Sequence, residues 1–307
     1  MSKRSVAIAG LGAAAGLTAL AVGRSRRARI HEPLAVLPHG EESKVETSDG
    51  AILHVHVAGE GPTVVLSHCW TGDMRIWEPV AADLVASGHR VVRYDQRGHG
   101  QSTIGAGGCR VERLGDDLHE LMVQLDVRDA IVAGHSMGGM TAQAFAIEHP
   151  DAVDERVRAI VLVATASGGQ NDEPLARVAP RFIGSPSLSR AMATRQGTVL
   201  VRGALGKGAN PHAVRLTRDT FVGTARDVRL NQLVALSKMD LRESRARISV
   251  PTTVVVGTRD TLTPPRFARD MADGIPGARL VVLPGLGHML PLEAPAEIAG
   301  LIADAGA

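Results

Sequence analysis

Residues 131–140 read IVAGHSMGGM, and this stretch indicates how the rest of the chain folds around it. An apolar, strand-like run leads into a Gly-His-Ser-Met-Gly-Gly turn, and a helical pattern follows. Gly134 and Gly138 lie two places on either side of Ser136, where larger side chains would collide as the backbone turns from strand to helix. Such a turn holds the serine hydroxyl clear of the sheet, at the positive end of a helix dipole. The sequence therefore predicts that Ser136 is a nucleophile.

Short β-rich runs alternate with longer helical stretches on both sides of this turn. Near the start of the body, KVETSDG and AILHVHVAG predict a hairpin around residues 48–50. The later apolar runs TVVLSH, RVVRYD, VRAIVLVATA, TTVVVGT and RLVVLPG are typical of strands that are covered on both faces. Strands that alternate with helices predict an α/β fold, with a mostly parallel central sheet and helices on both of its faces.

The alternation stops over about residues 168–248, where helix-like segments occur without a strong strand. We interpret this stretch as a helical cap inserted between the sixth and seventh strands of a domain that spans 31–307. It has 14 basic and six acidic residues, whereas the rest of that domain is acidic overall. Two interpretations remain open: solvated helix faces that pair with the acidic core, or a basic surface that faces anionic lipid or substrate.

A serine hydroxyl is a weak nucleophile until a base takes its proton, and a further group must orient that base. His288, in LPGLGHML, follows the last predicted strand, and Asp260, in VVVGTRD, ends the strand before it. Because ligands bind at the carboxyl edge of such sheets, these two residues and Ser136 are expected to lie together there. We predict that His288 is the base and Asp260 its orienting acid. His135 is adjacent to Ser136 and is expected to point away.

These motifs resemble the α/β-hydrolase family over roughly residues 44–307, through GHSMGG, GTRD, GLGHMLPLEAP, YDQRGHGQS and LSHCWTG. The order Ser136, Asp260, His288 is the one that this family shows. The resemblance implies that DQRGHGQS is a structural loop, whose Asp95 is not the triad acid. It also implies an oxyanion hole formed by the backbone N–H groups of Trp70 and Met137, and no metal or organic cofactor.

Cys69 is the departure from the family pattern, because many relatives have a glycine at this place. The second cysteine is Cys109, and two cysteines are too few for a disulfide framework. Either both thiols are buried and free, or they form one disulfide in an exported domain. The resemblance makes their strands, TVVLSH and RVVRYD, neighbours in the sheet, so the pairing stays open at this point.

The expected activity is hydrolysis of carboxylic esters, lipid-like esters included, through an acyl-enzyme on Ser136. A cofactor-free perhydrolase or haloperoxidase would use the same three residues. Epoxide hydrolases and dehalogenases need aspartate at the nucleophile position, so serine at 136 argues against both. A membrane-tethered binding protein that retains the fold without turnover is the alternative from another class.

Residues 1–30 form a separate segment with six basic residues and no acidic one. An uncharged run over 6–23 has just the length needed to cross a hydrocarbon core, and arginines follow it. We predict a membrane anchor, with the side of the membrane left open, or a signal segment whose cleavage would release a secreted protein. The remaining chain has 28 basic and 32 acidic residues, and aromatic residues make up only 2% of the whole. This composition argues against a nucleic-acid partner and favours a small-molecule substrate.

Overall fold

The fold is built on one eight-stranded sheet, seen here in a computed structural model that describes residues 33–36, 40–169, 185–206 and 208–306. The strand order is β1-β2-β4-β3-β5-β6-β7-β8. β1 pairs antiparallel with β2, and β2 with β4, whereas all other pairs are parallel. The strands are β1 Glu41–Glu46, β2 Ile52–Ala58, β3 Thr63–Ser67, β4 Arg90–Tyr94, β5 Ala130–His135, β6 Val157–Val163, β7 Thr252–Gly257 and β8 Arg279–Leu283. The predicted fold class is confirmed.

Helices cover both faces of this sheet because alternate strand residues point to opposite sides. Val65 and Val132 face a core that α3 and α4 cover, while Val64 and Ile131 face the core under α2 and α13. The helices of the core are α2 Glu78–Ala86, α3 Val111–Gln124, α4 Met137–Glu148, α5 Pro150–Arg156, α11 Pro265–Gly274, α12 Leu290–Glu293 and α13 Pro295–Asp304. Both faces of β5 are thereby buried, which fixes the strand that leads into Ser136.

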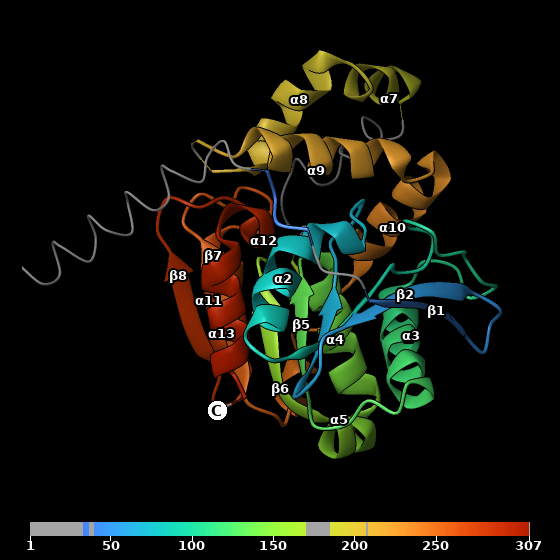
Figure 1. Ribbon diagram of the computed structural model, residues 1–307, viewed down its shortest axis with the longest axis vertical. Helices are drawn as coiled ribbons and strands as arrows, with labels where there is room; N and C mark the ends of the chain where they lie inside the picture. The colour runs from blue at the N-terminus through green and yellow to red at the C-terminus, as the bar shows by residue number, and fades with distance from the viewer. Residues whose placement is uncertain (1–32, 37–39, 170–184, 207, 307) are drawn as a thin grey trace, which may run out of the picture.

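Between β6 and β7 the described residues form four α-helices, most of which sit above the sheet in Figure 1. They are α7 Pro186–Met192, α8 Arg195–Val201, α9 Pro211–Gly223 and α10 Arg226–Lys238. Asn210 caps α9, since its side chain accepts a hydrogen bond from the N–H of His212 and Pro211 opens the first turn. We refer to the described residues of 185–248 as the cap; residues 170–184 of the predicted cap lie outside the described part of the chain.

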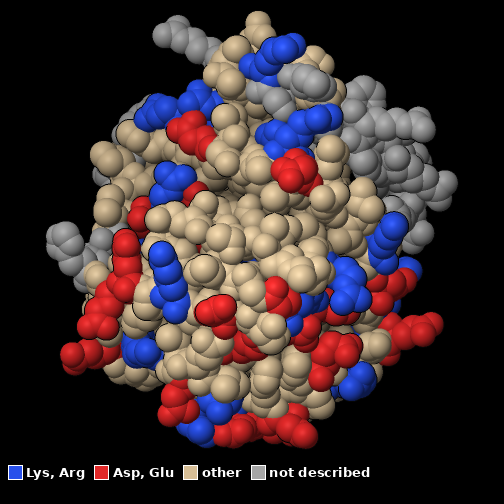
Figure 2. All heavy atoms as spheres, turned by 90° about the vertical axis from the view of Figure 1, so that its right-hand side faces the viewer, with Lys and Arg blue, Asp and Glu red and all other residues tan. Residues whose placement is uncertain are grey.

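Charge is distributed unevenly over the surface, and most acidic side chains in Figure 2 lie in its lower half, below the cap. The contacts between the two regions include an ion pair of Arg245, in the cap, with Asp270 of α11, in which Nη2 lies 3.1 Å from Oδ1. Such an ion pair is expected from the first of the two interpretations, in which basic residues of the cap pair with the acidic core.

The predicted anchor over residues 1–30 lies outside the described residues. In the part of the chain that is described, no helix combines the length and the apolar character needed to span a membrane.

Candidate active site

Ser136 sits in a tight turn between β5 and α4, in a backbone conformation that few residues other than glycine adopt. Its φ is 54°, in the left-handed region. The Ser136 N–H donates to the carbonyl oxygen of Val163 at 2.9 Å, and Thr165 Oγ1 donates to the Ser136 carbonyl oxygen at 2.7 Å. Strained residues of this kind persist only where the surroundings hold them, and they cluster at functional sites.

The two glycines beside Ser136 are required by close backbone contacts. A Cβ at Gly134 would lie 2.2 Å from the carbonyl oxygen of Gly138, and one at Gly138 would lie 2.1 Å from that of Ser67. Real Cβ atoms do not approach backbone atoms so closely. The turn therefore admits only glycine at both positions, for the reason inferred from the sequence.

Asp260 and His288 are in direct contact at the carboxyl edge of the sheet. Asp260 follows β7 and His288 follows β8; His288 Nδ1 lies 2.9 Å from Asp260 Oδ2, and both side chains are buried. Asp260 Oδ1 accepts the N–H groups of Leu262 and Thr263, and Thr263 Oγ1 donates to Oδ2 at 2.8 Å. These bonds fix the carboxylate and assign the proton of the neutral imidazole to Nδ1, so that Nε2 is left as an acceptor.

The environment keeps Asp260 ionised. Burial alone would raise the pKa of its carboxyl, but the charge of His288 and the hydrogen bonds from His288 and Thr263 outweigh burial and hold the pKa below its usual range. Thr263 was not singled out in the sequence, although a threonine three residues after an aspartate in a turn is a usual hydrogen-bond partner.

Ser136, Asp260 and His288 line one cavity of about 1020 Å³, which runs between the sheet edge and the cap. Ser136 Oγ has no hydrogen-bond partner among the described residues. Catalytic hydrogen bonds are often long in the absence of substrate and tighten in the reacting complex. No cluster of His, Cys, Asp or Glu in the described ranges is arranged to hold a metal ion.

Trp70 and Met137, the predicted oxyanion donors, lie on the two segments that meet beside Ser136. A Cβ at Gly138 would touch the carbonyl oxygens of Ser67 and His68, so the first turn of α4 lies against the end of β3. Neither the Trp70 N–H nor the Met137 N–H donates to another group within the described residues. The indole Nε1 of Trp70 reaches the cap, where it donates to the carbonyl oxygen of Arg229 at 3.2 Å.

Two buried histidines shape the loop that carries Trp70. His68 Nδ1 donates to the carbonyl oxygen of Cys69 at 2.8 Å, and its Nε2 accepts the N–H of Gln96 at 2.9 Å. His99 Nε2 accepts the N–H of Thr71 at 3.1 Å. Burial lowers the pKa of His68 to about 4 and that of His99 to about 3, so both rings are neutral.

His135 points away from the cavity, as expected, but it contacts the predicted base. Its Nε2 donates to the carbonyl oxygen of His288 at 2.8 Å, and the two ring centroids lie 5.0 Å apart. Burial, followed by the charge of His288, lowers the pKa of His135 to about 3. The residue before Ser136 thus supports the backbone of His288, a role that sequence position alone did not indicate.

We expect the fold to lose stability on mild acidification because of His68, His99 and His135. Their folded-state pKa values lie below the value near 6.5 of an unfolded chain, so the unfolded state binds more protons as the pH falls below that value. Each histidine lowers the free energy of unfolding by roughly 1.4 kcal/mol per pH unit within this window.

Urea unfolding followed by circular dichroism at pH 7.5 and pH 5.5 measures this loss. Burial raises the pKa of the Asp95, Asp117 and Glu78 carboxyls, an effect of opposite sign on the free energy of unfolding. Equal stability at the two pH values would contradict the assignment of three neutral buried histidines.

Cys69 and Cys109 are both free and buried, so the disulfide considered from the sequence is not formed. Burial raises the pKa of the Cys69 thiol to about 12, which leaves it protonated and unreactive. Cys69 instead opens a tight turn in which its carbonyl oxygen accepts the N–H of Gly72 at 3.0 Å. A cysteine is accommodated here because the side chain packs into the apolar cluster under the cap.

Comparison with known proteins places the chain in a family. Residues 62–295 match the model of the alpha/beta hydrolase fold. A solved hydrolase from Pseudomonas aeruginosa superposes with a TM-score of 0.72 at 30% identity, covering 87% of this chain and 99% of that one. The 3-oxoadipate enol-lactonase 2 of Acinetobacter baylyi is 29% identical over 76% of this chain and 84% of its own length. The non-heme chloroperoxidase CPO-A1 of Kitasatospora aureofaciens is 27% identical over 79% and 90%. The chain belongs to the α/β-hydrolase family and is a hydrolase of small molecules.

Proposed function

We propose that this protein hydrolyses carboxylic esters with Ser136 as nucleophile, His288 as general base and Asp260 as the group that orients the base. The observation that carries the proposal is the hydrogen bond of 2.9 Å between His288 and Asp260 at the wall of a cavity to which Ser136 is also exposed. The similarity to an enol-lactonase supports it, because a lactone is a cyclic ester.

In the proposed reaction, Ser136 Oγ attacks the ester carbonyl carbon while His288 Nε2 takes the hydroxyl proton. The imidazolium is stabilised by Asp260, and the carbonyl oxygen becomes an oxyanion that the N–H groups of Trp70 and Met137 stabilise. The C–O bond of the ester breaks as His288 returns the proton to the leaving alcohol. Water then attacks the acyl-enzyme, with His288 again as base, and the carboxylic acid and free Ser136 are formed.

We infer an apolar acyl group, lipid-like esters included, from the walls of the cavity. Large apolar side chains from the cap and from α4 line it, among them Met140, Leu188, Met192, Leu200, Val201, Phe221, Leu233 and Leu236. A site of this kind holds a substrate mainly through the apolar surface that it removes from water.

The value of kcat/KM is expected to rise with acyl length over a series of p-nitrophenyl esters. Each additional CH2 that enters the cavity contributes about 0.8 kcal/mol, or roughly a fourfold gain, until the cavity is filled. Initial rates with esters from acetate to laurate measure this. A maximum at acetate would exclude an apolar acyl site.

The similarity to a chloroperoxidase favours perhydrolysis as a second candidate function, with the same three residues and hydrogen peroxide in place of water. Product analysis with peroxide and a short organic acid separates the two. A rate of peracid formation higher than the rate of ester hydrolysis would favour perhydrolysis. A protein that only binds its ligand would not react at Ser136 with an organophosphonate probe.

We also propose that residues 1–30 attach the protein to a membrane. Deleting them is expected to move the protein from the membrane fraction to the soluble fraction and to leave kcat/KM unchanged, because the described core starts at β1, beyond this segment. Cell fractionation and assay of both forms measure this. An uncleaved full-length protein found wholly in the soluble fraction would contradict the anchor.

A further inference from the structure

One carboxylate, that of Glu293 at the end of α12, binds the backbone on both sides of His288. Glu293 Oε2 accepts the N–H of Gly287 at 2.9 Å, and Oε1 accepts the N–H of Met289 at 3.0 Å. The same Oε2 also accepts the N–H of Gly206, which belongs to the cap, at 2.7 Å. The carboxylate of Glu293 therefore accepts hydrogen bonds both from the loop that carries His288 and from the cap.

The cap contacts His288 directly at the same place. The N–H of His288 donates to the carbonyl oxygen of Ala204 at 2.8 Å, in the stretch 203–206 that we call the cap turn. A Cβ at Gly287 would lie 2.6 Å from the carbonyl carbon of Leu205, and one at Gly206 would lie 2.6 Å from Glu293 Oε2. The two segments are thus in backbone-to-backbone contact, which only glycine permits.

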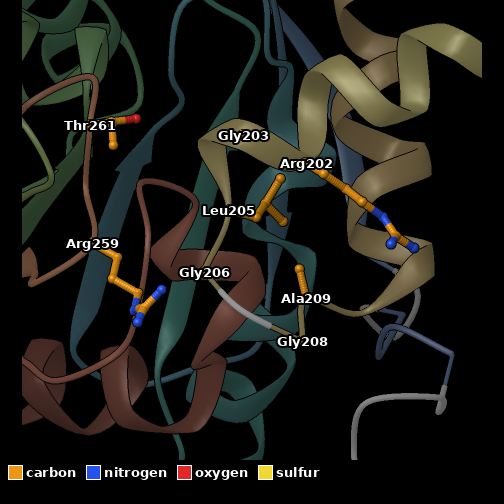
Figure 3. A pocket seen from close by; sticks show the side chains of 8 residues that line it. All are labelled: Arg202, Gly203, Leu205, Gly206, Gly208, Ala209, Arg259 and Thr261. Carbon is orange, nitrogen blue, oxygen red and sulfur yellow. The ribbon is translucent and has the colours of Figure 1, made fainter.

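The cap turn lies between two cavities. Ala204 lines the cavity of the active site, whereas Leu205 and Gly206 line a second cavity of about 500 Å³. In Figure 3, the side chain of Arg259 points toward Gly206, whereas the guanidinium of Arg202 points away from Gly206. The buried side chain of Leu205 and the polar contacts to Glu293 and His288 hold the turn against the loop of the base.

We propose that Glu293 is a positioning residue, which holds His288 against Asp260 and makes the geometry of the base depend on the docked cap turn. Three N–H donors converge on Glu293, two on Oε2 and one on Oε1, and such donors favour the ionised carboxylate, whose oxygens only accept. Burial raises the pKa of this carboxyl, and the three backbone N–H groups oppose that rise. The inference rests on the proposed function, since it assigns a role toward the proposed base.

The first test is Glu293→Gln, which keeps the size of the side chain but replaces one acceptor oxygen by an NH2 donor. Whichever way the amide is turned, at least one backbone N–H loses its acceptor. We expect kcat to fall about 10- to 100-fold, with a smaller change in KM, because a buried donor without a partner shifts the loop that carries the base. Glu60→Gln, in the exposed loop after β2, is the control for the loss of one charge.

The second test changes the cap side alone. Gly206→Ala places a methyl group against Glu293 and the carbonyl oxygen of Gly285, so the cap turn must move away from the loop. Gly203→Ala is the matched control, because a Cβ there has no atom within 4 Å. We expect Gly206→Ala to reproduce the loss of kcat seen in Glu293→Gln and Gly203→Ala to retain the activity of the unaltered protein.

Rates are expressed per reactive site, counted by titration with an organophosphonate probe, and kcat/KM is measured from pH 5 to pH 9. If Glu293 positions His288, kcat per titrated site should be lower in Glu293→Gln and in Gly206→Ala. The acidic side of their pH profiles of kcat/KM should also differ from that of the unaltered protein. Fewer titrated sites, each with an unchanged kcat and pH profile, would assign Glu293 a structural role only and overturn the inference. Failure of the unaltered protein to react with the probe would instead overturn the proposed function.

Discussion

We expect Ser136→Ala to lower kcat for a short aryl ester by roughly 10⁴- to 10⁶-fold, because it removes the only atom that forms the acyl-enzyme. His288→Ala is expected to cost a similar factor, since the hydroxyl then has no base. If these residues act as one unit, their losses cannot add. The double variant should therefore be scarcely slower than Ser136→Ala alone.

The measurement is kcat/KM for both single variants and the double variant, with folding checked by circular dichroism. Residual turnover above the rate in water should survive in all of them through the N–H groups of Trp70 and Met137. Near-normal turnover in a folded Ser136→Ala variant would show that the turn after β5 has no catalytic role. Losses that add in the double variant would show that the two side chains work independently.

We expect the second large effect from Asp260→Asn, which should lower kcat by about 10⁴-fold. The carboxylate accepts hydrogen bonds from His288 and from both polar groups of Thr263. An amide in its place would direct an NH2 group at one of these donors and favour the wrong tautomer of His288, with the proton on Nε2. That tautomer cannot accept the proton of Ser136.

Asp95→Asn is the matched control for this substitution. Asp95 is another buried aspartate at the same sheet edge, and it accepts the N–H groups of Met74 and Gln101 at 2.8 Å each. Its loss should lower stability, whereas kcat per folded molecule should stay within about tenfold of the original. An equal loss of kcat in the two variants would show that Asp260 acts through stability alone.

The sheet and the positions of the three central residues were predictable from the sequence because local rules govern them. Apolar runs define the strands, and the carboxyl ends of parallel strands converge, which brings Asp260 and His288 into contact. Gly134 and Gly138 report a backbone constraint that is local to one turn. These features need no knowledge of distant contacts.

The supporting residues were not predictable in this way, because their roles depend on tertiary contacts. His135 contacts His288 across 153 positions of sequence, and Gly206 contacts Glu293 across 87. Glu293 lies within the quoted motif GLGHMLPLEAP, yet only the folded chain shows that its carboxylate binds the cap. The free state of Cys69 and Cys109 likewise follows from packing, although their strands are neighbours.

The most direct test of Ser136 as the nucleophile is mass spectrometry of the protein after reaction with an aryl organophosphate, which mimics the first half of the proposed reaction. The account predicts one adduct per chain, on the peptide that contains Ser136, formed together with loss of esterase activity. The adduct should be absent in Ser136→Ala and form far more slowly in His288→Ala. An adduct on another residue, or continued ester hydrolysis by fully labelled protein, would contradict the account.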